Sequence, residues 1–327
     1  MDTNENAAVN IKPENRQIHK IIKKGTSKQQ KKFFMVGLLF ALPWIIGFLF
    51  FQLYPILCAI FYSFTDFNIF QKPNFIEFEN YKNLFVDPKF YQSLGNTAYM
   101  AFLGLPIGLV VALLIALLLN MNVKGMSVFR TLCYMPTVVP MVASAMLFLW
   151  VLNPEYGLIN IVLEPLGISG PSWLRDPRFT KLSLIIMDTW RCGNSAIIFL
   201  AALQAVPKSL YESAEIDGAT SFRKLIHISI PSISPTILFL TIMGLIYSFQ
   251  YFTQGFVFAQ VMELTQTAYG GPENSLLFYS LYLYQNGLSF LKMGYASAMA
   301  IILFIVVMTV SVIVIKMTNK RISYDLE

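Results

Sequence analysis

Long apolar stretches alternate with shorter polar ones along most of this chain. Six of the apolar stretches are long enough to cross a membrane as a helix, which takes about 20 residues. They cover residues 33–61, 97–119, 129–152, 182–203, 232–258 and 296–315. The pattern therefore predicts an all-α polytopic membrane protein, with six transmembrane helices in one domain over residues 33–318.

One polar stretch between two of these spans has a helical pattern of its own. Residues 207–231 read PKSLYESAEIDGATSFRKLIHISIP and carry too much charge to lie in hydrocarbon. Gly218 suits the left-handed residue that ends a first helix. Thr220 or Ser221 can cap a second short helix, and Pro231 closes it. We expect a helix–turn–helix at the membrane surface, joined to a spanning helix at each end.

The composition agrees with a membrane protein. Of the 327 residues, 56 % are hydrophobic and 13 % are charged, whereas ordinary soluble domains carry about 25 % charged residues. The formal net charge of +6 does not indicate nucleic-acid binding, because the basic residues follow the predicted topology. Cys58, Cys133 and Cys192 all fall in predicted spans, so no disulfide framework is expected.

The basic residues are distributed unequally between the two sides of the membrane. An even number of spans places both termini on one side, and that side carries 16 Lys and Arg against seven on the other. Eight of the 16 lie in the N-terminal segment 1–32, which is expected to be a disordered tail. Because basic residues collect on the cytoplasmic side, we expect both tails (1–32 and 319–327) and the 207–231 loop in the cytoplasm.

Two spans carry residues that a plain lipid-facing helix lacks. Two interpretations of Pro136 and Pro140 in the third span remain open. The prolines leave backbone carbonyls without helical partners, so that protein or a cavity must satisfy them, or they only kink a packing helix. In the fourth span, Asp188 and Arg191 are three residues apart and share a helix face. They are either functional charges or a structural pair whose members neutralise each other.

Short motifs in the 207–231 loop resemble the EAA loop of bacterial ABC importer permeases, in the carbohydrate (maltose-type, oligosaccharide) family. The motifs are Glu212-Ser213-Ala214, Asp217-Gly218-Ala219 and Ile228-x-Ile230-Pro231. Ser213 and Ile230 depart mildly from the family pattern without changing size or polarity greatly. Gly270-Gly271-Pro272 and Gly294-Tyr295-Ala296 also look like sugar-importer permeases, so the resemblance extends over nearly all of the chain from Phe33 onward.

The resemblance implies a coupling element that docks into a cleft of an ATPase subunit. The implied coupling residues are Glu212, Ser213, Ala214, Asp217, Gly218, Ala219 and Pro231. The implied partners are a second homologous permease, two ATPase subunits, an extracytoplasmic sugar-binding protein and an oligosaccharide substrate, in the lipid of a bacterial cell membrane. ATP and Mg would belong to the ATPase, and this chain would need no cofactor.

The external connection before the last span is the expected contact for the sugar-binding protein. Gly270, Gly271, Pro272 and Glu273 build a shaped loop rather than a membrane segment. The topology places this loop on the side opposite to residues 207–231, where a sugar would arrive.

Polar and aromatic side chains of the fourth and fifth spans are the candidate substrate path. Aromatic rings stack well against sugar rings, and amides can hydrogen-bond several hydroxyls at once. The candidates are Asp188, Trp190, Arg191, Asn194, Tyr247, Gln250, Tyr251 and Gln254. Each of them is also compatible with core packing or interfacial anchoring.

The sequence lacks the constellations that an enzyme requires. There is no G-x-x-x-x-G-K-[ST] stretch to hold ATP phosphates, and no catalytic or metal-binding residues are predicted. His19 and His227 both lie outside the spans, which argues against an intramembrane proton relay. An ion-coupled secondary transporter is the alternative function. It would carry acids or histidines along several spans and would need no structured docking loop.

Overall fold

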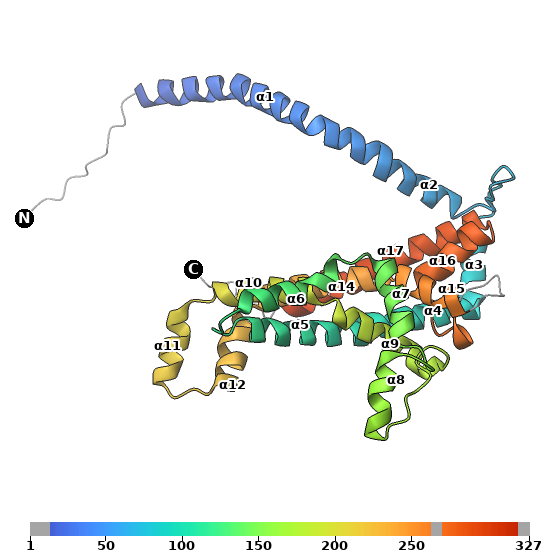
Figure 1. The fold of residues 1–327 in the computed structure, drawn as a ribbon. Coiled ribbons are helices and arrows are strands. Elements are labelled where there is room, and N and C mark those ends of the chain that lie inside the picture. The colour runs from blue at the N-terminus through green and yellow to red at the C-terminus, as the bar shows by residue number, and fades with distance from the viewer. Residues whose placement is uncertain (1–13, 263–269, 320–327) are drawn as a thin grey trace, which may run out of the picture. The chain divides into compact units, whose positions relative to one another are not determined.

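The computed structural model describes residues 14–262 and 270–319, and these residues are almost entirely helical (Figure 1). Among them, two isolated β-bridges join Thr65 to Phe75 and Asn68 to Gln71. The prediction of an all-α fold is confirmed for this part of the chain. The protein divides into two compact units, residues 1–58 and 59–327, and each is described by itself.

The first unit is one long helical segment. Helix α1 (Glu14–Phe48) continues into a π-helical turn, η1 (Leu49–Leu53), and the start of α2 (Tyr54–Tyr62). Its large apolar side chains are exposed on every side, as Phe40 shows with 82 % of its surface exposed. A helix that is apolar all round is one that lipid or other helices cover.

The N-terminal tail differs from its expectation. Residues 14–32 were expected to be disordered, but they are helical and continuous with the first span. The Lys, Gln, Glu and Arg residues that fill this segment are all strong helix formers, which hydropathy alone does not register. The rest of the expected tails, residues 1–13 and 320–327, lies outside the described residues.

The second unit begins with a polar connection and then a long bent helix. The connection contains α3 (Glu79–Val86). The long helix is made of α4 (Pro88–Tyr99), the π-helical turn η2 (Met100–Gly104) and α5 (Leu105–Leu119). It starts nine residues before the predicted second span, because Asp87 caps it by accepting a hydrogen bond from the Lys89 amide at 2.9 Å.

The third and fourth predicted spans are each broken into two helices. The first pair is α6 (Met126–Val138) and α7 (Met141–Val151), bent by 100°, and the second is α9 (Pro177–Trp190) and α10 (Gly193–Ala205), bent by 49°. The first break falls at Val139–Pro140, where proline removes a helical N–H. Between the pairs lie α8 (Leu158–Leu163) and the short η3 (Glu164–Leu166).

The last two spans follow the 207–231 loop. Helix α14 (Ser234–Phe249) ends where the sequence predicts a continuing span, and α15 (Thr253–Met262) begins after three intervening residues. A hairpin contains η5 (Pro272–Asn274), α16 (Tyr279–Tyr284) and η6 (Gln285–Ser289), and α17 (Met293–Asn319) is the final helix.

The described helices are compatible with four to six membrane crossings. Four are long and apolar enough by themselves, namely Gln29–Tyr62, Pro88–Leu119, Ser234–Gln260 and Met293–Thr318. The two bent pairs bring the number to six if each pair is one crossing. The chain is therefore a multi-pass membrane protein.

Small residues allow the helices of the second unit to approach one another closely. Ala112 and Ala116 of α5 and Ala196 of α10 are completely buried in one apolar cluster. A Cβ on Gly193 would lie 2.2 Å from the carbonyl oxygen of Cys133 in α6. Small residues at helix contacts are typical of membrane bundles, where close backbone packing replaces the hydrophobic drive.

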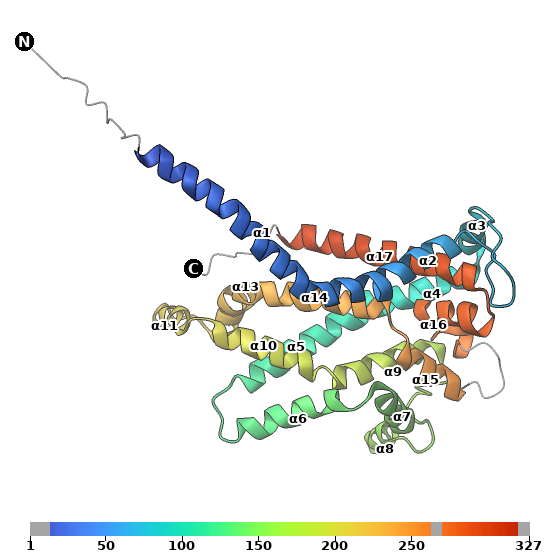
Figure 2. The ribbon, with the colours of Figure 1, turned by 90° about the horizontal axis from the view of Figure 1, so that it is seen from above.

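The 207–231 loop forms two helical pieces at one end of the second unit. They are α11 (Lys208–Ile216) and α12 (Ser221–Lys224), the latter continuing through η4 (Leu225–Ser229) into α13 (Ile230–Ser232). Both views place α11 at the end of this unit opposite to α3 and α16 (Figures 1 and 2). Loops 59–87 and 270–292 therefore lie at the far end from α11.

Candidate functional site

The turn between α11 and α12 is closed by backbone hydrogen bonds. Gly218 has a φ of +71°, the left-handed conformation predicted for it. The Ala219 amide donates to the Ala214 carbonyl at 2.8 Å, and the Gly218 amide donates to the Glu215 carbonyl at 3.0 Å. This pair of bonds is the Schellman arrangement that ends a helix in a fixed direction. Thr220, rather than Ser221, then caps α12, its side chain accepting from the Arg223 amide.

Side chains tie the two short helices together. Lys224 donates to the Glu215 carboxylate at 2.6 Å, and the Tyr211 and Ser229 hydroxyls are 2.9 Å apart. The Lys224 side chain is 17 % exposed and the Glu215 side chain 66 % exposed, so solvent still reaches the carboxylate side of this ion pair. Neither Glu215 nor Lys224 was singled out from the sequence, although their charges were visible in it.

The loop presents an exposed tip. Glu212, Ser213, Asp217 and Gly218 are exposed, and Ala214 and Ala219 are half-buried. Within the described residues, the Glu212 and Asp217 side chains have no hydrogen-bond partner, so both carboxylates face outward. Two large apolar side chains beside them, Ile216 and Phe222, are 88 % and 70 % exposed.

Pro231 lies one residue before the end of the second helical piece, which runs without interruption from α12 through η4 and α13 to Ser232. Only Ile233 separates this piece from α14. The loop therefore passes almost directly into the next span.

Arg191 lies at the break between α9 and α10 and contacts the break between α6 and α7. Its Nη1 donates to the carbonyls of Pro136 at 3.1 Å and Val139 at 2.7 Å, and also to the Ser144 hydroxyl. The helical partner of the Pro136 carbonyl would be the amide of residue 140, which proline lacks. Of the two explanations for the paired prolines, the structure favours the first, in which backbone carbonyls lose their helical partners and accept hydrogen bonds from another part of the protein.

Asp188 has partners other than Arg191. Tyr251 donates its hydroxyl to Asp188 Oδ2 at 2.8 Å, and the Gln254 side chain is a second hydrogen-bond partner of this carboxylate. Salt bridges among the described residues do not include one between Asp188 and Arg191. The two side chains thus have different hydrogen-bond partners, Asp188 at the α14–α15 break and the start of α15, and Arg191 at the α6–α7 break.

One pocket collects most of the candidate substrate-path residues. It has a volume of about 410 Å³ and lies between α5, α9, α14 and the α14–α15 break. The six candidates that line it are Asp188, Arg191, Tyr247, Gln250, Tyr251 and Gln254. The other two do not, since Trp190 packs against Phe148 with ring centroids 5.5 Å apart and Asn194 is exposed elsewhere. Gly104, Gly108 and Ser195 also line this pocket and were not predicted for it.

The loop predicted to face the binding protein is rigid. Gly271 has a φ of +69°, and a Cβ there would lie 2.8 Å from Leu276. Gln92 of α4 donates to the Glu273 carbonyl at 2.7 Å, and Asn96 donates to the Asn274 carbonyl at 2.8 Å. Gly270 and Gly271 are buried, Pro272 is half-buried and Glu273 is exposed, so only part of the predicted contact is accessible in this chain.

A multi-pass helical bundle with bent helix pairs and a polar pocket between them is the arrangement expected of a membrane transport protein. The chain belongs to the family described as binding-protein-dependent transport system inner membrane component, whose sequence signature matches residues 104–324. It is the membrane permease component of an ABC transport system, which confirms the expected family. The expectation of a permease rather than an enzyme is confirmed by the same membership.

Curated relatives cover most of the chain. A probable ABC transporter permease, YesP of Bacillus subtilis, is 34 % identical over 91 % of this chain and 95 % of its own length. The arabinooligosaccharides transport system permease protein AraP of the same organism is 33 % identical over 86 % of this chain and 88 % of its own. An ion-coupled secondary transporter, the alternative left open by the sequence, is not compatible with this membership.

A solved structure has the same fold. The bacterial alginate ABC transporter in complex with an alginate pentasaccharide-bound periplasmic protein matches with a TM-score of 0.73. The match covers 90 % of this chain and 97 % of that one, at 24 % sequence identity. At this identity the likeness establishes the arrangement of helices.

Proposed function

We propose that this chain is a permease subunit of an ATP-driven importer for an oligosaccharide or a related sugar derivative. The relative AraP, named for arabinooligosaccharides, and the family's dependence on a binding protein support this substrate class. The observation that carries the energy-coupling part is the tip of the 207–231 loop. It combines a Schellman turn, an ion pair between its two helices and two exposed apolar side chains, Ile216 and Phe222.

A loop of this kind suits a docking role. Exposed large apolar side chains beside unpartnered carboxylates, on a segment too charged for hydrocarbon, are typical of a protein–protein contact. Rigidity matters because a loop that deforms under load cannot transmit motion to the helices α10 and α14 on either side of it. We assign this loop to the ATPase subunit, which would supply ATP, Mg and hydrolysis.

The remaining topology follows from this assignment. Six membrane crossings, with each bent pair counted as one, would put both termini and the 207–231 loop on one side, and the assigned ATPase contact makes that side the cytoplasm. The 270–273 loop then faces the outside and is the proposed contact for the extracytoplasmic binding protein. A second, homologous permease would complete the path together with the pocket at Asp188 and Tyr251.

Uptake by the reconstituted transporter tests this function. The complete complex, with both permeases, the ATPase and the binding protein, is placed in vesicles and supplied with arabinotriose, maltotriose, lactose or an alginate trisaccharide. We expect ATP-dependent accumulation of at least one saccharide, and none without the binding protein. Transport of none of them, alongside ATP-dependent uptake of another solute class such as an amino acid or a peptide, would contradict the proposal.

A further inference from the structure

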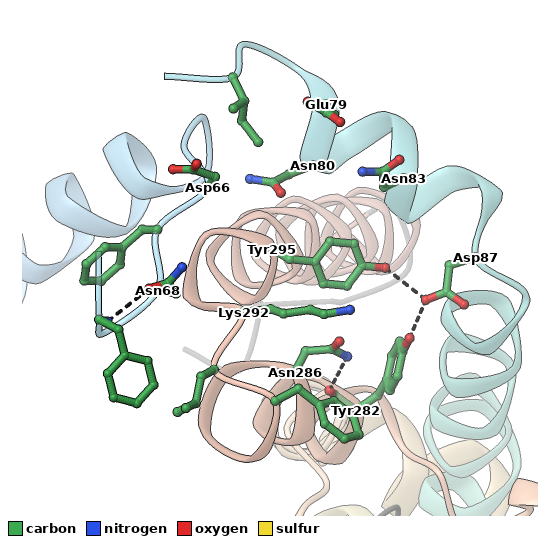
Figure 3. A pocket seen from close by; sticks show the side chains of 15 residues that line it. Asp66, Asn68, Glu79, Asn80, Asn83, Asp87, Tyr282, Asn286, Lys292 and Tyr295 are labelled. Atoms are coloured by element: carbon green, nitrogen blue, oxygen red, sulfur yellow. Dashed lines mark hydrogen bonds between the residues drawn. The ribbon is translucent and has the colours of Figure 1, made fainter. Parts of the chain in front are cut away.

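A second and larger cavity lies in the 59–327 unit, away from the pocket at Asp188. It has a volume of about 880 Å³ (Figure 3), and its lining residues lie around α3 and α16, at the end of this unit opposite to α11 (Figure 1). This volume falls within the range of about 300–1,000 Å³ that is usual for small-molecule sites. Its walls come from residues 66–70, the segment around α3, and the hairpin from α16 to the start of α17.

The walls of this cavity are held in place by hydrogen bonds. Asp87 Oδ2 accepts from the hydroxyls of both Tyr282 and Tyr295, which joins α4 to α16 and α17 (Figure 3). The buried Asn80 amide donates to the Ser63 and Thr65 carbonyls at 2.9 and 2.8 Å. Burial, and then the Asp87 carboxylate, raise the pKa of Tyr282 to about 12, so its hydroxyl remains protonated at physiological pH. The cavity is therefore formed before any ligand arrives.

Several groups that line this preformed cavity remain free to bind a ligand. Among the described residues, the side chains of Glu79, Asn83 and Lys292 have no hydrogen-bond or ion-pair partner. Asn68 uses its amide oxygen to hold the amides of residues 70 and 71, which leaves its NH₂ group available. Phe70 offers a ring that is 81 % exposed.

The charges that line the cavity limit what it can hold. The carboxylates of Asp66, Glu79 and Asp87 outnumber the single Lys292 ammonium, so the lining disfavours an anion. Figure 3 shows Lys292 extending between Tyr295 and Asn286 into the cavity. A neutral polyhydroxy compound can hydrogen-bond to both kinds of charged group, because each hydroxyl can donate to a carboxylate and accept from an ammonium or amide group. The aromatic rings offer faces for the apolar side of a sugar ring.

We propose that this cavity is a second saccharide site of the permease, one that receives an uncharged sugar at the side where the binding protein delivers it. The inference rests on the proposed function and adds a substrate class to it. It separates this chain from a transporter of alginate, whose uronic acid units would meet three carboxylates here. A segment of the binding protein could fill this cavity in place of a sugar, and labelling with the unliganded binding protein tests that alternative.

Cysteine protection tests the site directly. The complete transporter is prepared without Cys58, Cys133 and Cys192 and carries a reporter at Ile76→Cys, a lining position that contributes no hydrogen bond from its side chain. The matched control reporter is Val86→Cys, which is exposed on α3 outside the cavity. Labelling rates with a methanethiosulfonate reagent are measured in nanodiscs with arabinotriose, maltotriose or an alginate trisaccharide.

We expect a neutral trisaccharide to slow labelling at position 76 by about tenfold when its concentration is about ten times its dissociation constant. It should leave position 86 unchanged, and the alginate trisaccharide should protect neither position. Adding Asn83→Ala should weaken protection by about two- to tenfold, as expected for one lost hydrogen bond. Gln71→Ala, an exposed amide that does not line the cavity, should have no effect.

Three results would overturn the site. The first is that a saccharide slows labelling equally at positions 76 and 86, and the second is that the unliganded binding protein alone slows labelling at position 76. The third is that a saccharide which the same transporter takes up does not slow labelling at position 76. The last outcome leaves the proposed function standing, because uptake has been measured. Absence of uptake for every saccharide, alongside ATP-dependent uptake of another solute class, would instead remove the function on which this site rests.

Discussion

Arg191 Nη1 lies 2.7 Å from the carbonyl oxygen of Val139, and this bond joins the breaks of the two bent helix pairs. One break is where α9 meets α10, and the other is where Pro140 interrupts α6 and α7. A freed backbone carbonyl inside a membrane needs a donor, and Arg191 supplies one to both Pro136 and Val139. The charge is thus used to stabilise an irregular backbone beside the polar pocket.

Replacing Arg191 should therefore destabilise the bundle as well as impair uptake. Arg191→Leu leaves two carbonyls without this donor, and each buried unpaired group costs about 1–3 kcal/mol. Arg191→Lys keeps the charge but loses the planar fork, so an intermediate loss is expected. Thermal unfolding of the purified complex in nanodiscs measures the stability, with vesicle uptake beside it. An Arg191→Leu complex with unchanged thermal stability would show that these bonds do not hold the break.

The Asp188–Tyr251 hydrogen bond should appear as a coupling energy. Tyr251→Phe and Asp188→Asn each weaken the same 2.8 Å bond, so their effects on stability should not add. Neighbouring residues that share a bond couple by about 0.5–3 kcal/mol in a double-mutant cycle. Tyr247→Phe is the matched control, because Tyr247 lines the same pocket and has no hydrogen-bond partner for its hydroxyl among the described residues. Strict additivity of the Asp188 and Tyr251 changes would argue against this bond.

Gly218 tests whether the 207–231 loop couples to the ATPase. No atom lies within 4 Å of a Cβ built on this glycine, so the cost of a side chain is conformational rather than steric. A residue other than glycine in the left-handed region costs about 1–2 kcal/mol. Gly218→Val should abolish uptake and substrate-stimulated ATP hydrolysis while the permeases still pair.

Asparagine provides the control for Gly218. It adopts the left-handed conformation more readily than other residues, so Gly218→Asn should keep most of the transport activity. Glu212→Ala should reduce uptake less severely than Gly218→Val, because it removes an exposed carboxylate without changing the turn. Normal transport by Gly218→Val with the ATPase bound would mean that the loop is not a coupling element.

Single-cysteine labelling should locate the two loops on opposite sides of the membrane. In a background without Cys58, Cys133 and Cys192, a cysteine at Ser213 should react only from the cytoplasmic side. A cysteine at Glu273 should react from outside in intact cells. Position 273 is preferable to 271, because Gly271 is buried and has a positive φ. Labelling of position 213 from outside would reverse the topology and remove the coupling assignment with it.

The features that the sequence by itself determined are local ones. Apolar runs of about 20 residues have to leave water, so the membrane class follows from composition and length alone. The charged stretch 207–231 has to stay out of hydrocarbon, and Gly218 is the residue that adopts a left-handed turn most cheaply. The motifs of that stretch then led to the family, because they lie within one short segment of the chain.

Only the tertiary structure decided how sharply the third and fourth predicted spans bend and which groups meet across their breaks. Hydropathy averages over a window of residues, so the third and fourth apolar stretches were each predicted as a single helix. The structure has two helices in each of these stretches. Asp188 and Arg191 are three residues apart, yet Tyr251 and the Val139 carbonyl are their partners, 63 and 52 residues away. The cavity at Asp87 joins residues almost 200 positions apart, as the 195 residues from Asp87 to Tyr282 show. Such contacts depend on how the helices pack, because only packing brings distant side chains within hydrogen-bond distance.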